Sequence, residues 1–284
     1  MFFSVSTVAI MALTAAAMPF QPAGSLARRE FPLLNATSSS NSTSVNGTST
    51  GAAHHNGTLH LTNTVKRHSN SLYSTMDKRS SCVSTPSSST ADDDDGGRGI
   101  TITNSDTERR GYYVYANGCD SVPYRYLWIE AGSSGFITLP EGFQGRITRG
   151  TDEHNLSGCS AEEWLGTWFE IGYDADGQAY ADVSLIRGCD GAVTICSGDG
   201  TGATAGFSQW ILDGAPDGAY ATKPSGAQAL AAAEGLDGAI NTVVRDWYMD
   251  KVGQTNAYVD DYHGNPVIHS SNGRFDVSFL EGHP

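Results

Sequence analysis

Residues 168–188 read WFEIGYDADGQAYADVSLIRG, two runs of alternating apolar and polar residues on either side of an Asp-Gly turn. Such a pattern is typical of two antiparallel strands joined by a short hairpin loop. Because side chains alternate between the two faces of a strand, one buried face for both runs puts Glu170 and Asp182 together on the opposite face. That solution requires an odd loop, such as the three residues 175–177, and it places Glu170 directly opposite Asp182. A two-residue turn would instead put the two acids on different faces.

Two opposed carboxyl groups suggest a chemical role. Glycoside hydrolysis usually needs two carboxyl groups about 5–5.5 Å apart for retention or about 6.5–9.5 Å apart for inversion. Glu170 and Asp182 are therefore the candidate catalytic residues, and the alternative is a solvated pair without a site. A calcium loop of Asp174, Asp176 and Asp182 lacks the spacing of the twelve-residue motif, and the histidines lack the spacing of metal ligands. We therefore expect no metal site and no cofactor.

Short runs rich in β-branched and aromatic residues, bounded by Gly, Pro and Asn, lie on both sides of this hairpin. They cover 99–104, 111–118, 124–132, 134–142, 144–150 and 266–279. Many short strands separated by turn residues predict a mainly β protein, an antiparallel β-sandwich.

The segment at about 205–262 has a different character and predicts a helical lobe inserted between the strands. The sequence GAQALAAAEG at 226–235 contains helix-forming residues behind Ser225, a favoured N-cap residue. Asp237 is the expected cap of a second helix. The apolar face of that helix combines positions i, i+3, i+4 and i+7, which are Ile240, Val243, Val244 and Trp247.

The first 98 residues differ from the domain expected at 99–284. Residues 1–17 carry a short apolar run ending in small residues, as a secretory signal peptide does. Residues 18–79 are rich in Ser, Thr and Asn and are expected to be a disordered propeptide, with dibasic processing sites that end at Arg67 and Arg79. Residues 80–98 are expected to be a flexible acidic tail. Sequons for N-glycosylation begin at Asn35, Asn41, Asn46, Asn56 and Asn155.

The net charge of the chain limits the classes of molecule that it is expected to bind. The chain has 17 Lys and Arg and 31 Asp and Glu, of which six and two lie in residues 1–79, so the remainder has a formal net charge of −18. Nucleic acid binding needs clustered basic residues and is not expected. No later apolar stretch approaches the roughly twenty residues of a membrane span. With the signal peptide, this predicts an exported, extracellular protein. We expect it to be a monomer.

Four cysteines fall in the expected domain, namely Cys119, Cys159, Cys189 and Cys196, and Cys82 lies in the acidic segment. An even number in an exported domain predicts two disulfides, although three connectivities are open. We favour Cys189 with Cys196, because a strand and turn could close the six residues between them. Cys119 would then pair with Cys159.

Several of these segments resemble the thaumatin-like proteins. They are ITITNS at 100–105, GRITRG at 145–150, the hairpin at 168–188, and NAYVDDYHGNPVIHSSNGRFDVSFLEG at 256–282. The low number of cysteines and the long leader are similar to the reduced-cysteine members secreted by filamentous fungi. The resemblance implies a cleft between sandwich and lobe, where acidic residues and one Arg bind β-1,3-glucan and, in some members, hydrolyse it.

The resemblance also implies roles for individual residues. Glu170 matches the cleft Glu of the family and Asp182 its first cleft Asp, whereas Arg187 stands where the family has a second Asp. Either Arg146 or Arg149 matches the cleft Arg, and the acid of the lobe cannot be placed. Trp168, two residues from Glu170 and on the same face, is the best candidate for stacking against a sugar.

Three functions are compatible with these observations. The first is a secreted, cell-wall-associated protein that binds β-glucan without strong catalysis. The second is an endo-β-1,3-glucanase that uses Glu170 and Asp182. The third is an adhesin or effector that contacts a host surface protein and requires no cleft chemistry. Arg187, a cation where an acid would assist hydrolysis, favours binding over catalysis.

Overall fold

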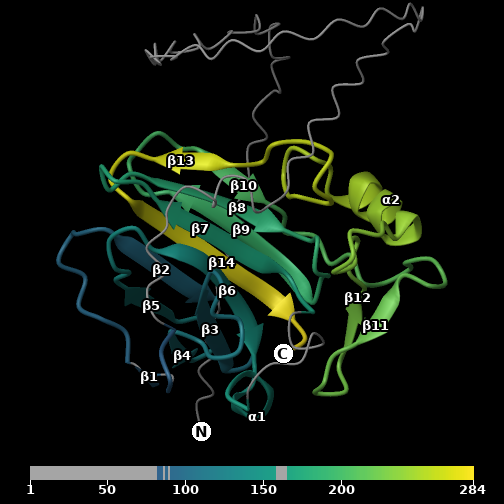
Figure 1. Cartoon of the computed structure of the whole chain (residues 1–284), viewed down its shortest axis with the longest axis horizontal. Helices are drawn as coiled ribbons and strands as arrows, with labels where there is room; N and C mark the ends of the chain where they lie inside the picture. Colours follow the sequence, from purple (N-terminus) through teal and green to yellow (C-terminus); the bar gives the residue numbers. More distant parts are fainter. Residues whose placement is uncertain (1–81, 86, 89, 158–164) are drawn as a thin grey trace, which may run out of the picture. The chain divides into compact units, whose positions relative to one another are not determined.

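A computed structural model of the chain describes residues 82–85, 87–88, 90–157 and 165–284 (Figure 1). Three features expected from the sequence lie outside these residues. They are the signal peptide, the propeptide with its four sequons and its processing sites at Arg67 and Arg79, and Cys159. Strands dominate the described residues, which confirms the mainly β prediction. No helix in these ranges is long and apolar enough to cross a membrane.

The strands form two large sheets and one small one. The seven-stranded sheet has the order β1 (Ser87–Ser88), β4 (Arg125–Ile129), β3 (Arg110–Ala116), β6 (Gln144–Gly150), β7 (Trp168–Tyr173), β8 (Ala179–Ser184) and β13 (Ile268–Ser270). The five-stranded sheet has the order β10 (Thr204–Gly206), β9 (Gly191–Ser197), β14 (Arg274–Gly282), β2 (Gly99–Asn104) and β5 (Ser134–Ile137). Most neighbours are antiparallel, whereas β14 with β2 and β1 with β4 are parallel.

The two large sheets pack face to face around one apolar core, as the sandwich prediction requires. Phe169 of β7 meets Phe275 of β14 with ring centroids 6.3 Å apart, and Tyr112 of β3 meets Phe279 of β14 at 4.8 Å. These aromatic contacts cross from one sheet to the other. They assign one face of the seven-stranded sheet to the core, which leaves its other face to carry polar side chains.

The hairpin of β7 and β8 has the register that the alternation predicts. Glu170 is the Cα partner of Asp182, and Tyr173 is the partner of Ala179. The loop is closed by Asp174, whose backbone N–H donates to Gln178 O at 2.9 Å, so three residues lie between these two. Gly177 at the end of this loop has φ +80°, a conformation that glycine adopts with little strain.

The lobe contains less helix than the sequence predicts. Residues 226–235, expected to be helical, include the strand β12 (Gln228–Leu230), which pairs with β11 (Tyr220–Thr222). Leu230 also exchanges two backbone hydrogen bonds with Cys189, of 2.8 and 3.1 Å. This tertiary pairing outweighs the helix propensity of the alanines, because propensity differs by less than about 1 kcal/mol per residue.

The second expected helix is present but begins later. Helix α2 (Thr242–Lys251) has Asn241 as its N-cap, whose side chain accepts from the N–H of Val244 at 3.4 Å. Asp237 instead closes a turn by accepting from the N–H of Ala239. The buried face of α2 is formed by Val244 and Tyr248. In Figure 1, α2 and the β11–β12 hairpin lie on the same side of the two sheets.

The described part of the acidic segment, expected to be flexible, is bound to both sheets. Asp92 forms an ion pair with Arg125 of β4, with Oδ2 2.8 Å from Nη1 and Oδ1 3.0 Å from Nη2. Asp94 binds Arg274 of β14 with similar two-point geometry at 2.9 and 2.6 Å. The acidic residues of this segment are therefore partners for specific arginines rather than solvated charges.

The disulfide prediction is wrong. Cys82 is bonded to Cys119, with Cα atoms 5.3 Å apart, and both Cys189 and Cys196 are free. All but Asp190 of the residues between the last two belong to one extended strand, β9 (Gly191–Ser197), rather than to a strand and turn. At about 3.3 Å per residue this strand separates the two cysteines far beyond the roughly 7 Å that a disulfide can span.

Candidate functional site

Three charged side chains lie in one row across the seven-stranded sheet. Arg146 of β6 is the Cα partner of Glu170 of β7, and Glu170 is the partner of Asp182 of β8. We call these three residues the charged row, and Glu170 with Asp182 the acid pair. The neighbouring residues Phe169 and Val183 point into the core, so the charged row lies on the opposite face. Directly opposed residues have Cβ atoms about 4.5–5.5 Å apart, which brings the two carboxyl groups close together.

Arg146 is the arginine of this row. Its guanidinium lies between two aromatic rings, 4.9 Å from the ring centroid of Tyr115 and 4.2 Å from that of Trp168. Its Nη1 donates to Asp120 Oδ1 at 2.6 Å. Stacking on two rings and pairing with a carboxylate keep a buried guanidinium stable in one position.

Arg149, the alternative in the sequence, lies on the other face of the sheet. Its guanidinium carbon is 5.6 Å from the ring centroid of Phe279 in the core. Nη1 donates to Asp190 Oδ1 at 3.3 Å, and Nη2 donates to Leu280 O at 2.6 Å. Arg149 therefore supports the packing of the two sheets, and the structure leaves Arg146 as the arginine beside the acid pair.

The acid pair is held in an environment that favours protonation. Burial raises the pKa of Glu170, while the charge of Arg146 and a hydrogen bond with Ser184 oppose that shift. Burial, followed by the negative charge of Glu170, raises the pKa of Asp182 well above its usual range. The Oδ1 atom of Asp182 is buried and has no hydrogen-bond partner among the described residues. Two neighbouring carboxyl groups in such a site bind one proton between them more readily than isolated acids do.

The lobe contributes a further acid, which the sequence did not place. The backbone of Tyr258 binds the end of β8 through two hydrogen bonds. The N–H of Tyr258 donates to Val183 O at 2.8 Å, and the N–H of Leu185, the residue after β8, donates to Tyr258 O at 2.7 Å. Three residues later, Asp261 is close enough for its charge to raise the pKa of both Glu170 and Glu234. The Asp-Asp pair in YVDDYHG was the available signal, but its position beside β8 depends on the fold.

Asp260, the other half of that pair, has a structural role. Its side chain is fully buried, and its Oδ1 accepts from the backbone N–H groups of Tyr262 and His263 at 2.9 Å each. Because it shapes the turn that follows, it helps to set the position of Asp261.

Arg187 follows β8 and binds the lobe. Its Nη1 donates to the backbone carbonyl of Glu234 at 2.7 Å. Its positive charge lowers the pKa of Glu170 and of Glu234, although burial raises both. Arg187 therefore supplies a positive charge at the position where the thaumatin-like proteins, which the sequence resembles, carry a third acid.

Aromatic side chains flank the acid pair along the strands. Trp168, half-buried, is two residues before Glu170 on the same face of β7. Tyr180, 46% exposed, is two residues before Asp182 on β8 and contacts His269 at a tilted angle, with ring centroids 5.0 Å apart. Since the strands are antiparallel, Trp168 and Tyr180 lie on opposite sides of the acid pair. Sequence reasoning considered tryptophans for this purpose and missed Tyr180, although the alternation around Asp182 could have identified it.

Comparisons with known proteins identify fold neighbours. No family model and no curated protein matches the chain. Among solved structures, the chain is similar to a laminaripentaose-producing β-1,3-glucanase in complex with laminaritetraose, with a TM-score of 0.41, 11% identity, and 64% of this chain and 98% of that chain covered.

Two further solved structures are similar. One is the protein elicitor MoHrip2 from Magnaporthe oryzae, with a TM-score of 0.32, 8% identity, and 65% and 100% of the two chains covered. The other is the thaumatin-like xylanase inhibitor TLXI, with a TM-score of 0.33, 12% identity, and 64% and 99% covered. The last belongs to the family that the sequence resembles. All three TM-scores are below 0.5.

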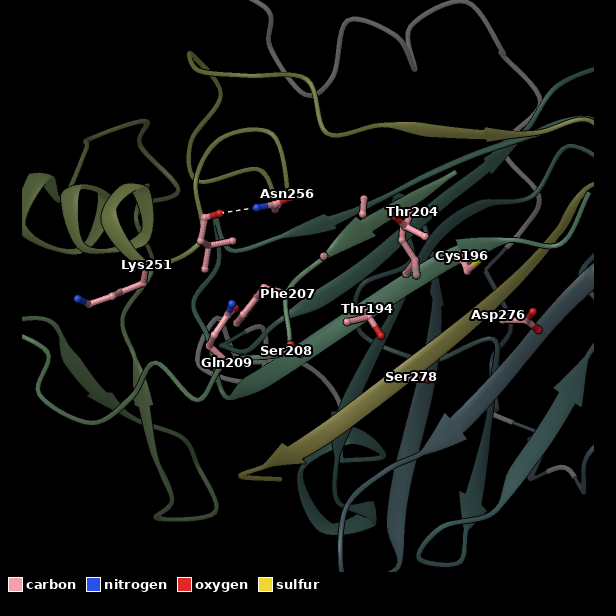
Figure 2. Close-up of a pocket in the computed structure, with 14 residues that line it drawn as sticks. Thr194, Cys196, Thr204, Phe207, Ser208, Gln209, Lys251, Asn256, Asp276 and Ser278 are labelled. Carbon is pink, nitrogen blue, oxygen red and sulfur yellow. Dashed lines mark hydrogen bonds between the residues drawn. The ribbon is translucent and has the colours of Figure 1, made fainter. Parts of the chain in front are cut away.

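A hollow of about 530 Å³ lies elsewhere, on the outer face of the five-stranded sheet. Figure 2 shows residues that line it, along β9, β10 and β14 and at the end of α2, including Thr194, Cys196 and Asp276. Neither member of the acid pair lines it. We place the candidate site at the charged row because several ionisable groups converge there.

Asn155, the sequon inside the domain, is not available as a glycosylation site. Its side chain is buried, its Nδ2 donates to the hydroxyl of Tyr115 at 3.0 Å, and its Oδ1 accepts from the N–H of Thr151 at 2.9 Å. A glycan on Nδ2 would break the first of these bonds and has no space in the folded chain.

Proposed function

We propose that the domain binds a neutral cell-wall polysaccharide, with β-1,3-glucan as the first candidate, along the face that carries the charged row. The observation that supports this proposal is the acid pair itself, two opposed carboxyl groups flanked by Trp168 on one side and Tyr180 on the other. Carboxyl oxygens accept hydrogen bonds from sugar hydroxyls. Aromatic rings offer apolar faces to sugar rings, as in other sites with a few convergent polar groups. Export directed by the expected signal peptide would bring the domain to such a polymer.

Binding is favoured over hydrolysis by the arrangement of the acids. Glycosidases place one carboxyl group to protonate the leaving oxygen and another to attack or activate water near the anomeric carbon. Glu170 and Asp182 project from neighbouring strands of one sheet face, so both approach a ligand on that face from the same side. Arg187 also supplies positive charge where a further acid would assist protonation of the leaving group.

Endo-glucanase activity is the second candidate, and one observation favours it. Burial and the charge of Glu170 raise the pKa of Asp182 well above its usual range, while the charge of Arg146 opposes the rise at Glu170. A protonated acid next to an ionised one is the combination that a retaining glycosidase uses. The enzyme hypothesis therefore requires a direct measurement.

The test compares binding and cleavage on the full-length chain. Wild type, Glu170→Gln and the control Asp176→Asn, an exposed acid in the loop of the same hairpin, are sedimented with insoluble β-1,3-glucan. Reducing ends released from laminarin are measured in parallel. We expect wild type and the control to bind, Glu170→Gln to bind at least tenfold more weakly, as the loss of about 1.4 kcal/mol would cause, and none to release sugar.

Other results would overturn the proposal in defined ways. Release of reducing ends by wild type that is absent in Glu170→Gln would establish the enzyme instead. Failure of wild type to bind or cleave the glucan would exclude both candidates and favour the host-interaction hypothesis.

A further inference from the structure

Asp120, in the loop between β3 and β4, binds the arginine of the charged row. Its Oδ1 accepts from Nη1 of Arg146 at 2.6 Å, and the side chain of Arg146 is only 5% exposed. Arg146 is the Cα partner of Glu170, a position from which an arginine side chain can reach the carboxylate. Among the described residues, however, no ion pair joins Arg146 to Glu170. Asp120 and Glu170 therefore compete for one guanidinium, and in this structure Asp120 holds it.

The guanidinium is also fixed by the two aromatic rings of Tyr115 and Trp168. The ring contacts hold the group beside Tyr115 and Trp168, and the ion pair binds its Nη1 end. The ion pair adds a direction to the ring contacts, because a ring face does not select which carboxylate the guanidinium donates to.

The loop that carries Asp120 is held by a disulfide. Cys119 directly precedes Asp120 and is bonded to Cys82. The backbone N–H of Cys119 donates to Ala116 O at 3.0 Å, and that of Asn117 donates to Gln144 O at 2.9 Å. The first bond closes a turn at the end of β3, and the second holds the start of the loop against β6. The disulfide holds it at the residue beside the carboxylate.

We propose that Asp120 is a positioning residue of the charged row: it holds the guanidinium of Arg146 away from Glu170, and the Cys82–Cys119 disulfide holds Asp120 in place. The acid pair thereby stays without a bound cation and open to hydrogen-bond donors of a ligand. When an external dithiol reduces the disulfide, the dithiol is oxidised to its own disulfide and Cys82 and Cys119 become two thiols. Asp120 is then released, and Arg146 turns toward Glu170. Ligand binding at the row is coupled in this way to the redox state of one disulfide, a consequence that rests on the proposed function.

The groups facing Glu170 determine what the change does to its proton affinity. They are Arg146 from β6, Asp182 and Ser184 from β8, Arg187 after β8, and Asp261 from the lobe. Asp120 contacts one of these, Arg146. Removing the charge of Asp120 lowers the pKa of Glu170, because the freed guanidinium of Arg146 approaches it.

The decisive variant is Asp120→Asn in the full-length chain, with Asp217→Asn, an exposed acid of the lobe, as the charge-matched control. The pKa of Glu170 is followed by carbon NMR of side-chain-labelled glutamate. We expect a decrease of about one unit or more in Asp120→Asn, as is usual for an acid that gains an arginine neighbour, and no change in the control. A purely structural role of Asp120 would lower thermal stability without this decrease. An unchanged or raised pKa of Glu170 would therefore overturn the proposal.

The disulfide is tested by mild reduction of wild type and by the double variant Cys82→Ser with Cys119→Ser. Both should lower the pKa of Glu170 in the same direction as Asp120→Asn. If the double variant does not fold, reduction of wild type decides this part. An unchanged pKa after reduction, together with a lowered pKa in Asp120→Asn, would reject the role of the disulfide and retain that of Asp120.

Glucan sedimentation separates this inference from the proposed function. Wild type that fails to bind glucan, together with a lowered pKa in Asp120→Asn, would reject the ligand and retain the positioning role. If wild type binds glucan and Asp120→Asn changes neither the pKa of Glu170 nor the affinity for glucan, the ligand is retained and the positioning role is rejected. We expect wild type to bind and Asp120→Asn to bind at least threefold more weakly.

Discussion

Replacing Asp182 by Asn should stabilise the folded protein at neutral pH while weakening the candidate site. The wild-type carboxyl group is opposed to Glu170 on the neighbouring strand, and its buried Oδ1 has no hydrogen-bond partner among the described residues. Asparagine has nearly the same shape and no charge. The substitution therefore removes a repulsion and a desolvated charge with little change in packing.

The size of the effect follows from the spacing of the strands. Two unit charges about 5 Å apart repel by about 3 kcal/mol at an effective dielectric constant of about 20. The attraction of Arg146 and the partial exposure of the pair offset part of this repulsion. We expect the free energy of unfolding to increase by about 1–2 kcal/mol at pH 7.5.

The pH dependence has a definite sign. The folded-state pKa of Asp182 is raised, first by burial and then by Glu170, so between the unfolded pKa of about 3.9 and the folded pKa the native state binds more protons than the unfolded state. Wild type therefore loses stability as the pH rises through this window, and the variant does not. The advantage of Asp182→Asn should be near zero at pH 4 and full above the folded pKa.

Urea denaturation of wild type, Asp182→Asn and the control Asp176→Asn at pH 4.0 and 7.5 measures this difference. The control should change the free energy of unfolding by less than about 0.5 kcal/mol, as surface substitutions usually do, and the urea dependence should be equal in all three. A variant that is less stable than wild type at pH 7.5 would refute the reasoning. An equal gain at both pH values would also refute it, because the effect would then not come from the charge.

Two further predictions concern stability. Asp92→Asn should destabilise the fold by about 3 kcal/mol at pH 7, because buried Arg125 loses a two-point ion pair. Because Arg125 lowers the pKa of Asp92, wild type loses this stability as the pH falls below about 3.9. The difference measured by urea denaturation should therefore shrink at low pH, and a constant difference would contradict the ion-pair explanation. Gly273→Ala should lower the melting temperature more than Gly218→Ala. Both glycines have positive φ, +70° and +86°, but a Cβ atom at Gly273 would lie 2.7 Å from Gly177 O, whereas Gly218 has nothing within 4 Å. Equal decreases would show that the left-handed conformation alone, worth about 1 kcal/mol, determines the cost.

Local patterns in the sequence were sufficient to predict the β-sandwich and the central hairpin. Alternation has a period of two residues, so the apolar residues around Glu170 and Asp182 define which face is buried and what loop length keeps both runs on it. The pairing of Glu170 with Asp182 follows from neighbours within 20 residues. No distant part of the chain is needed for that inference.

Features that depend on distant residues were not predictable in this way. The alanine-rich segment at 226–235 has a weak preference for helix, which the pairing of Leu230 with Cys189 overrides. Cys82 and Cys119 are 37 residues apart, and only the path of the folded chain brings them together. Arg146 and Arg149 lie on one strand with opposite orientations, and the position of the second sheet decides which of them is beside the acid pair.

The candidate site shows the same division. Sequence alone determined that two acids share one face of a hairpin, because strand alternation is a local property. Only the tertiary structure decided that Asp120 binds the arginine of that row, that Asp261 approaches from the lobe, and that Arg187 binds the backbone of Glu234. These contacts join segments that are far apart in the chain, and their energies depend on burial and on charge spacing, which exist only after the two sheets and the lobe have packed.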